Sequence, residues 1–329
     1  MKRQAILVLA ILVLLAITPW ASADFIGAWG RTPFGAVDVP TGGDFVAISA
    51  YNYAGLALRS DGSLAAWGGY QGEGGEPPFL PSGNDFVGIA GAGNNSLALK
   101  SDGSLVWWTD DHYVFTGAPS GNDFVSIAAI QTNSGATGLA LRSDGSLVAW
   151  DNEHSTGPLY VPSGNDFVAI SGGLSDCAAA LRSDGSIAAW DVFGGDISVP
   201  SGNNYVAIAA GFGLDGLALK SDGSIVAWGG IGGYATPAGD DFVAISAGVS
   251  TGVALRSDGS LVGWGLWHDL MAVPLGNTFT AISVYGQYGL ALSSQPYEPY
   301  VVPIPSAVLL ASTGLSFSGW LLRRRRAWH

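Results

Sequence analysis

The sequence has a single cysteine, Cys177, in 329 residues. One thiol excludes an intramolecular disulfide and a metal cluster held by several thiolates. An exposed thiol is a liability in an oxidising compartment, so we expect Cys177 to be buried as a small apolar side chain. The fold must therefore be stabilised by packing, and the chain is long enough to bury a large core.

Basic residues are also scarce, with 13 Lys+Arg against 26 Asp+Glu. Two terminal segments that contain no acid hold six of the basic residues, namely Lys2, Arg3, Arg323, Arg324, Arg325 and Arg326. The region between them has seven basic and 26 acidic residues, a net charge of −19. Binding to nucleic acid needs patches of Lys and Arg, so we expect no nucleic-acid partner. A surface of this charge keeps a protein soluble and attracts cations or basic partners.

Residues and motifs typical of catalytic sites are few. The sequence has four histidines, and nucleophile-elbow, phosphate-loop and dinucleotide-binding motifs are absent. His112, His154 and His268 each follow a repeated tryptophan by a few residues. A metal site is one interpretation of these histidines, and solvated loop residues are the one we favour. We expect no catalytic residues, no metal site and no cofactor.

The first 23 residues are typical of a secretory signal peptide. Lys2 and Arg3 precede an apolar run over residues 5–17, and Ala21 and Ala23 form an Ala-x-Ala cleavage site. The run is shorter than the ~20 residues that a membrane-spanning helix needs, which favours cleavage over an uncleaved anchor. We therefore expect signal peptidase to release an exported protein that begins at Asp24.

Short units repeat through the middle of the chain, which is rich in glycine. Each unit reads Asp-Phe-Val-Ala-Ile, a small-residue stretch, Gly-Leu-Ala-Leu-Arg, Ser-Asp-Gly-Ser and Leu-Val-Ala-Trp, followed by a variable segment. The Ser-Asp-Gly-Ser tetrad occurs six times, beginning at Ser60, Ser101, Ser143, Ser183, Ser221 and Ser257. The opening aromatic residue occurs seven times, at Phe45, Phe86, Phe124, Phe167, Tyr205, Phe242 and Phe279. The closing tryptophan also occurs seven times, at Trp29, Trp67, Trp108, Trp150, Trp190, Trp228 and Trp264.

The tetrad predicts a tight turn between two strands. Asp-Gly between apolar runs is the signal of a two-residue hairpin, for which we expect a type I′ turn with positive φ at both central residues. Leu-Ala-Leu-Arg and Leu-Val-Ala-Trp then form an antiparallel pair, and Asp-Phe-Val-Ala-Ile adds a third strand. Three strands, with room for a fourth in the variable segment, are typical of a propeller blade.

The two ends of the repeat region are offset in a way that favours a closed ring. The last unit stops at Ser293-Ser294, without a turn or a tryptophan strand, and the missing strand is found at residues 25–30. Pairing that strand into the last unit leaves no free sheet edge, whereas an open solenoid would need capping units. We predict an all-β, seven-bladed β-propeller over residues 24–292, closed by the mature N-terminal strand.

The unit resembles the repeat of the regulator-of-chromosome-condensation (RCC1) family. The shared pattern is Val-Ala-Ile-x-Ala-Gly followed by Leu-Ala-Leu-x-x-Asp-Gly-x-Leu-x-x-Trp-Gly, and it covers residues 25–292. The short units are most similar to those of compact bacterial members, such as a secreted propeller that inhibits β-lactamases. Trp-Asp replaces Trp-Gly at Trp150 and Trp190, and no partner-binding residues of the family can be matched, so its nucleotide-exchange role is not carried over.

The C-terminal end resembles a PEP-CTERM sorting signal. After a linker at residues 293–301, Val302, Pro303, Ile304 and Pro305 precede an uncharged stretch over residues 306–322 and the four arginines. The resemblance implies a membrane helix over about 306–322 and removal of residues 302–329 by an exosortase. Ile304 stands where the motif has glutamate. A plain anchor with stop-transfer charges is the alternative, and in both cases the arginines stay cytoplasmic.

The variable segment after each tryptophan is the best candidate for a recognition surface. These segments differ in length while the strands do not, and all follow the same strand, so we expect them to emerge on one face. Their aromatic side chains suit protein hot spots or stacking on sugars. The candidate binding residues are Tyr70, Tyr113, Phe115, Tyr160, Phe193, Tyr234 and Trp267, with Met271 beside the last.

A cation precedes each tetrad. These residues are Arg59, Lys100, Arg142, Arg182, Lys220 and Arg256. A ligand-binding ring of cations and local pairing with carboxylates are the two interpretations, and we favour local pairing.

Three functions fit the sequence. We favour an exported or surface-associated scaffold that binds a protein or an extracellular glycan through one face, in the envelope or matrix. A polysaccharide-active hydrolase or lyase is the second, and it requires paired carboxylates or a histidine cluster at one mouth of the channel. A structural matrix protein without a specific ligand is the third. We expect no enzymatic activity.

Overall fold

The computed structural model describes residues 24–30, 38–52, 54–68, 78–109, 117–132, 135–151, 159–266 and 273–296. Within these residues, seven antiparallel sheets of three strands each account for β1 to β21, and the one helix is the short 3-10 turn η1 (Ile231–Gly233). No helix in the described part is long and apolar enough to cross a membrane.

Each sheet is one blade, and we number the blades 1 to 7 by their first strands. The first strands are β2 (Phe45–Tyr51), β5 (Phe86–Ala92), β8 (Phe124–Thr132), β11 (Phe167–Gly172), β14 (Tyr205–Ala210), β17 (Phe242–Ala247) and β20 (Phe279–Tyr285). The second strands are β3 (Ala54–Arg59), β6 (Asn95–Lys100), β9 (Gly135–Arg142), β12 (Cys177–Arg182), β15 (Gly216–Lys220), β18 (Thr251–Arg256) and β21 (Tyr288–Ser293). The third strands are β4 (Leu64–Gly68), β7 (Leu105–Thr109), β10 (Leu147–Asp151), β13 (Ile187–Asp191), β16 (Ile225–Trp228), β19 (Leu261–Gly265) and, in blade 7, β1 (Phe25–Gly30).

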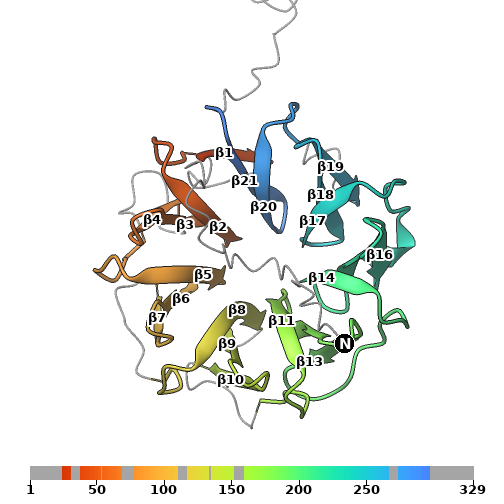
Figure 1. The fold of residues 1–329 in the computed structure, drawn as a ribbon, viewed down its shortest axis with the longest axis horizontal. Helices are drawn as coiled ribbons and strands as arrows, with labels where there is room; N and C mark the ends of the chain where they lie inside the picture. The colour runs from red at the N-terminus through yellow and green to blue at the C-terminus, as the bar shows by residue number, and fades with distance from the viewer. Residues whose placement is uncertain are drawn as a thin grey trace, which may run out of the picture. The chain divides into compact units, whose positions relative to one another are not determined.

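The seven blades form a closed ring (Figure 1). Each first strand contacts the first strands of both neighbouring blades, including β20 with β2. The N-terminal strand β1 completes blade 7 by pairing antiparallel to β21, from Phe25 opposite Ser293 to Gly30 opposite Tyr288. The predicted seven-bladed propeller and its closure are therefore confirmed.

The same hydrogen bond joins every pair of neighbouring blades. The backbone amide of each opening aromatic residue donates to the carbonyl of the tetrad glycine in the preceding blade, as Phe86 does to Gly62 at 3.2 Å. At the point of closure Asp24 takes the place of that glycine, and the Phe45 amide donates to its carbonyl at 3.2 Å. The closing junction is therefore held like the six junctions within the repeat.

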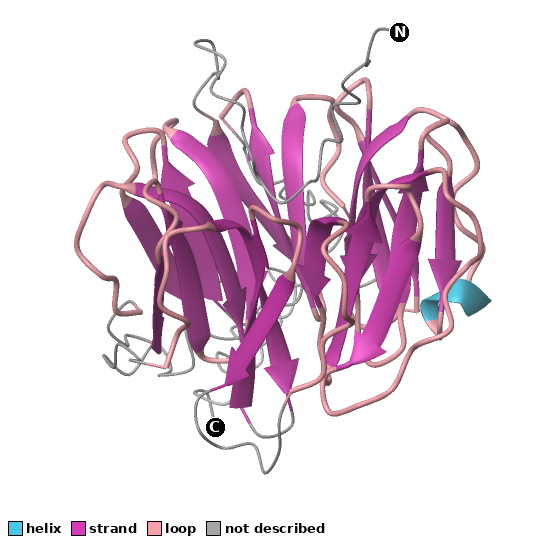
Figure 2. Ribbon diagram, turned by 60° about the horizontal axis from the view of Figure 1, so that its bottom comes forward, coloured by secondary structure: helices cyan, strands magenta, loops and turns pink. Residues whose placement is uncertain are grey.

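The antiparallel order places two kinds of connection at opposite ends of the ring (Figure 2). We call the end with the tetrads, which join second to third strands, the turn face. The opposite end, the loop face, carries the turns between first and second strands and the residues that directly follow each third strand. Both described ends of the chain lie on the turn face, because Asp24 is paired with Phe45 and β21 ends there at Ser293.

The turn at each tetrad differs from the type I′ turn that we predicted. The tetrad glycines have φ between 81° and 85°, but none of the tetrad aspartates has positive φ. In blade 1 the Gly62 amide donates to the Arg59 carbonyl at 3.0 Å, which makes a β-turn that ends in a left-handed glycine. The Asp61 carboxylate accepts bonds from the Ser63 amide at 2.9 Å and hydroxyl at 2.7 Å. These bonds stabilise the turn without positive φ at the aspartate.

The core lies between neighbouring blades. In one cluster Leu139 of blade 3 packs with Ile170 and Trp190 of blade 4. Each tryptophan is paired with a residue of the second strand, and in five blades that residue is a glycine that lies beneath the indole ring. A Cβ on Gly55 would lie 2.1 Å from the Trp67 indole, so any residue other than glycine at this position would displace the indole.

The described parts of the variable segments add little strand structure. Among the described residues, their one bridge to a third strand joins Trp190 to Asp196 in blade 4. The fourth strand for which the sequence left room is therefore reduced to a single bridge in that blade.

Candidate binding surface

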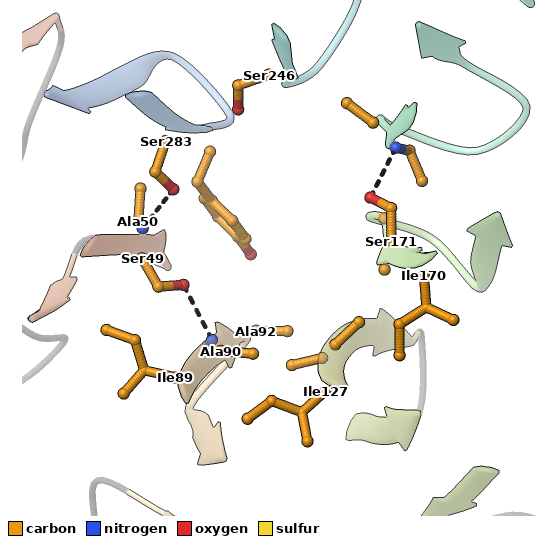
Figure 3. A pocket seen from close by; sticks show the side chains of 18 of the residues that line it. Ser49, Ala50, Ile89, Ala90, Ala92, Ile127, Ile170, Ser171, Ser246 and Ser283 are labelled. Carbon is orange, nitrogen blue, oxygen red and sulfur yellow. Dashed lines mark hydrogen bonds between the residues drawn. The ribbon is translucent and has the colours of Figure 1, made fainter. Parts of the chain in front are cut away.

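The first strands of all seven blades surround a central cavity of about 220 Å³ (Figure 3). Serine hydroxyls bridge neighbouring first strands here: Ser49 accepts the Gly91 amide at 3.1 Å, and Ser283 accepts the Ala50 amide at 2.9 Å. The lining residues in the described part include no carboxylate, imidazole or basic side chain. The described part of the cavity wall therefore joins neighbouring blades through serine hydroxyls and backbone amides.

One hydrogen bond crosses the channel at its loop-face end. Tyr285, the last residue of β20 in blade 7, donates its hydroxyl proton to the Gln131 side chain on β8 of blade 3. Blades 3 and 7 lie on opposite sides of the ring (Figure 1). This bond narrows the loop-face mouth of the channel.

The turn face carries a repeated arrangement of cation, carboxylate and ring. In blade 3 the Arg142 Nη1 lies 2.8 Å from Asp123, and its guanidinium carbon lies 4.7 Å from the centre of the Phe124 ring. Four other blades have the same arrangement around Arg59, Lys100, Arg182 and Arg256, with ion pairs of 2.5–3.1 Å. Half-exposed pairs of this kind contribute only ~0–1 kcal/mol each. The preference for local pairing of the cations is confirmed in these five blades.

Blades 5 and 7 depart from this arrangement. In blade 5 Asn204 occupies the place of the aspartate and Tyr205 that of the phenylalanine, and Lys220 forms no ion pair with any described residue. In blade 7 the cation is replaced by Ser293, whose hydroxyl lies 2.7 Å from that of Thr278. The turn face therefore has the same ion pair in five blades, whereas blades 5 and 7 lack it.

The tetrad aspartates add negative charge to the turn face. The hydroxyl of the serine two residues later is the largest cause that lowers the pKa of each carboxyl below 3.8, and that serine's amide is the next. These carboxyls are fully exposed and therefore ionised at neutral pH. They are Asp61, Asp102, Asp144, Asp184, Asp222 and Asp258.

The loop face is irregular over three consecutive blades. Two residues separate the first strand from the second in blades 1, 2, 3 and 7, but the turn is residues 173–176 in blade 4, 211–215 in blade 5 and 248–250 in blade 6. Among the described residues, positive φ outside glycine occurs only here, at Ser175, Asp176 and Ser250. Such strained conformations cluster at functional sites.

Backbone hydrogen bonds join these turns into one surface. The Val192 amide, just beyond β13, donates to the Asp176 carbonyl at 2.8 Å. The Leu174 amide of the same turn donates to the Gly211 carbonyl of blade 5 at 2.7 Å. The blade 4 turn is therefore held between the end of β13 and the blade 5 turn.

The connection continues into blade 6 through a buried carboxylate. Asp215 accepts hydrogen bonds from the amides of Gly230 and Ile231 and, at 3.2 Å, from the hydroxyl of Ser250. The Ser250 carbonyl accepts the Leu266 amide at 2.9 Å. We call this continuous surface the loop belt; it comprises residues 173–176, 191–196, 211–215, 248–250 and 266.

Large apolar side chains are exposed along the loop belt. Phe193 is 48% exposed, Phe212 45%, Leu214 62% and Leu266 53%. Tyr160 lies beside the belt, with its amide bonded to the Val192 carbonyl at 2.7 Å and its hydroxyl 3.3 Å from Asp196. Several exposed apolar side chains on one surface are typical of an interaction site.

The structure brings two of the predicted binding residues together, because Tyr160 and Phe193 both lie at the loop belt. Tyr234 instead follows η1 and packs against the core cluster around Ile231. The other candidates lie outside the described residues: Tyr70, Tyr113, Phe115, Trp267 and Met271, together with His112, His154 and His268. No group of three metal-ligating side chains forms in the described part of the chain.

Sequence reasoning missed Phe212 and Leu214, which lie in the turn between β14 and β15 and not after a tryptophan. A weak signal was present. The interval from the opening aromatic to the tetrad is 16 residues in the units of Phe167 and Tyr205, against 15 in the units of Phe45, Phe86 and Phe242 and 19 in the unit of Phe124. The extra residue accompanies the longer turns of blades 4 and 5, whereas in blade 3 the additional residues lengthen β8 and β9.

The cysteine lies directly beneath the loop belt. Cys177 is 3% exposed, and its thiol lies 3.3 Å from the Gly211 carbonyl. Burial is the main cause that raises the pKa of the Cys177 thiol to about 12. The negative charges of Asp215, Asp176 and Asp191 also raise this pKa. The prediction that Cys177 is a buried apolar residue is confirmed.

Comparison with known proteins identifies the fold. No protein-family model matches the chain, and no curated protein matches it in sequence. Among solved structures, yeast RCC1 (Prp20) bound to Kap60 is similar with 16% identity and a TM-score of 0.60, over 84% of this chain and 90% of that one. Human WBSCR16 has 15% identity and a TM-score of 0.62, over 82% and 100%.

A plant receptor also shares the fold. The CRINKLY WD40 ectodomain of the receptor kinase ACR4 from Arabidopsis thaliana has 15% identity and a TM-score of 0.57, over 74% of this chain and 91% of that one. At these identities the similarity shows the fold alone. The chain has an RCC1-like propeller fold.

Proposed function

We propose that this protein is a binding scaffold that recognises a protein partner through the loop belt. The observation that carries this proposal is that a ring with seven nearly equal blades departs from its repeat at three consecutive blades, where large apolar side chains are exposed. A rigid scaffold with variable loops is a common arrangement for recognition. Exposed apolar surface of this kind favours a protein over a glycan as the ligand class.

The structural relatives support a protein partner. Prp20 from Saccharomyces cerevisiae, similar with 15% identity and a TM-score of 0.62, over 85% of this chain and 93% of that one, is described with binding properties to Gsp1p and histones. The yeast RCC1 structure above contains Kap60. All of these partners are proteins, although the partner of this chain need not resemble any of them.

We also propose that the protein is exported, with signal peptidase cleaving after Ala23 and an exosortase removing residues 302–329. The support is the sequence of the two ends. Mass spectrometry of the mature protein should find Asp24 at the N-terminus and no peptide beyond the Val302 motif. An intact C-terminus would contradict processing, and an intact N-terminus would contradict export by this route.

Site-specific photo-crosslinking tests the binding proposal. A photoreactive phenylalanine analogue replaces Phe193 in the full chain, and a matched variant carries it at Leu275, which is 83% exposed on the turn face. We expect a discrete adduct from position 193, which excess unmodified protein suppresses, and none from position 275. Equal crosslinking at both positions, or none at position 193, would reject the loop belt as the recognition surface.

A further inference from the structure

The described basic side chains are confined to the turn face, which also carries the tetrad aspartates, whereas the charged side chains of the loop belt are all acidic. Each described basic residue ends a second strand at the turn face: Arg59, Lys100, Arg142, Arg182, Lys220 and Arg256. The loop belt contains four aspartates and no lysine or arginine, the aspartates being Asp176, Asp191, Asp196 and Asp215. No described cation therefore neutralises the belt, whereas five of the six cations on the turn face are paired with carboxylates.

The belt carboxylates produce a negative field where the apolar side chains are. Asp196 is exposed, and its charge is the largest cause that raises the pKa of Tyr160. Asp191 accepts a hydrogen bond from the Phe193 amide at 2.8 Å, which places a carboxylate at the backbone of an exposed phenylalanine. Asp176 and Asp215 are buried below. Negative charge next to low-dielectric apolar surface attracts cations more strongly than charge in open water.

These observations define a complementary ligand. An acidic segment meets repulsion along the whole belt, and so does a nucleic-acid backbone. A purely cationic polar segment would leave Phe193, Phe212 and Leu214 in water. A segment in which lysine or arginine alternates with apolar side chains satisfies both features of the belt. Building on the proposed function, we infer that the loop belt docks a basic amphipathic segment of the partner protein.

Peptide binding to the full chain tests this inference. The probe is a fluorescein-labelled peptide of alternating lysine and leucine, titrated with protein and followed by fluorescence anisotropy. The comparison peptides alternate lysine with serine and glutamate with leucine. We expect the lysine–leucine peptide to bind at least about tenfold more tightly than either. Equal binding of the lysine–serine peptide, or binding of the glutamate–leucine peptide, would overturn the inference.

Paired variants locate the binding. Phe212→Ala with Leu214→Ala should weaken binding of the lysine–leucine peptide about tenfold or more, while Leu275→Ala, at a more exposed apolar residue on the turn face, should leave affinity unchanged. Asp196→Asn should weaken binding at low salt and reduce its salt dependence, and its turn-face control Asp258→Asn should not. Equal effects of belt and control variants would show that the peptide binds the acidic protein non-specifically and would overturn the inference.

The crosslinking experiment separates this inference from the proposed function. An adduct at position 193 whose partner segment is acidic or uncharged would leave loop-belt recognition standing and reject the basic amphipathic partner. An adduct within a segment rich in lysine or arginine and apolar residues supports both. All the substituted side chains are exposed, so we expect every variant to fold, and thermal unfolding of each variant checks this.

Discussion

The turn face and the loop face are two ends of the same seven blades, yet they differ in regularity. On the turn face, all six tetrads have the same turn, and five blades repeat one arrangement of cation, carboxylate and ring. On the loop face, blades 4, 5 and 6 have longer turns, strained residues and exposed phenylalanine and leucine side chains. What repeats in every blade builds the ring, and what differs between blades is free to recognise a partner.

The comparison predicts that substitutions in the repeated scaffold reduce stability and that substitutions in the loop belt do not. The largest effect should come from Trp29→Ala. Trp29 is 6% exposed and packs over Gly289 in the closing blade, so we expect a loss of about 3–5 kcal/mol in the free energy of unfolding, measured with denaturant. Trp150→Ala, at 7% exposure inside the chain, should cost as much. A much smaller loss of unfolding free energy for Trp29→Ala than for Trp150→Ala would show that the closing strand contributes less to stability than an internal strand.

Gly252→Ala should destabilise the ring by overpacking. A Cβ at Gly252 would lie 2.3 Å from the Trp264 ring, and relieving such a clash costs about 1–3 kcal/mol. In blade 4 Ala178 already stands opposite Trp190, so that site accommodates a methyl group. Ala178→Gly is the control, with an expected loss of about 0.5–1 kcal/mol from strand flexibility alone. Chemical denaturation measures the free energy of unfolding of both variants. An unchanged stability of Gly252→Ala would show that the Trp264 indole can move aside.

Asn204→Asp should restore the ion pair that blade 5 lacks. The new carboxylate takes the place next to Lys220 that Asp166 has next to Arg182, and we expect a gain of about 0–1 kcal/mol that falls as salt is added. Asp166→Asn should produce a loss of the same order. Thermal unfolding at low and high salt measures both changes. A salt-independent gain would contradict the electrostatic explanation.

Ser63→Ala should change the titration of one turn aspartate. The Ser63 hydroxyl is the largest cause of the lowered pKa of Asp61, so its removal should move that pKa upward toward 3.8. A pKa lowered by folding contributes stability above 3.8, and that contribution is lost as the pH falls through the folded-state value. NMR titration of the Asp61 carboxyl measures the change, and Ser63→Thr, which keeps the hydroxyl, should leave it as in the parent. An unchanged pKa in Ser63→Ala would show that the backbone amide alone holds the carboxylate.

The ring could be predicted because its signals are local and repeated. Seven opening aromatics, seven tryptophans and the displaced strand at residues 25–30 fix both the number of blades and the closure. The type I′ turn was wrong because the bonds from Ser63 to Asp61 depend on side-chain positions that a dipeptide signal does not contain. Repetition predicts that all six tetrads share one turn, but it gives no information about which type of turn they share.

The loop belt could be predicted only in part. Phe193 follows a repeated tryptophan and was found by that rule, whereas Phe212 lies in a turn between strands and was not. Its membership of the belt depends on the contact between Leu174 and Gly211, residues in different blades. Spacing within one unit does not show which turns of neighbouring units touch.

The double substitution Phe212→Ala with Leu214→Ala should have the smallest effect on stability. Both side chains are exposed at the loop face, so the free energy of unfolding should change by no more than about 0.5 kcal/mol. Denaturant unfolding of the double variant beside Gly252→Ala measures this contrast within one protein. A loss as large as that of the glycine variant would mean that the belt turns support the ring, and the division between a scaffold and a recognition surface would fail. A change within the expected limit, together with lost peptide binding, would show that the two faces have separate roles.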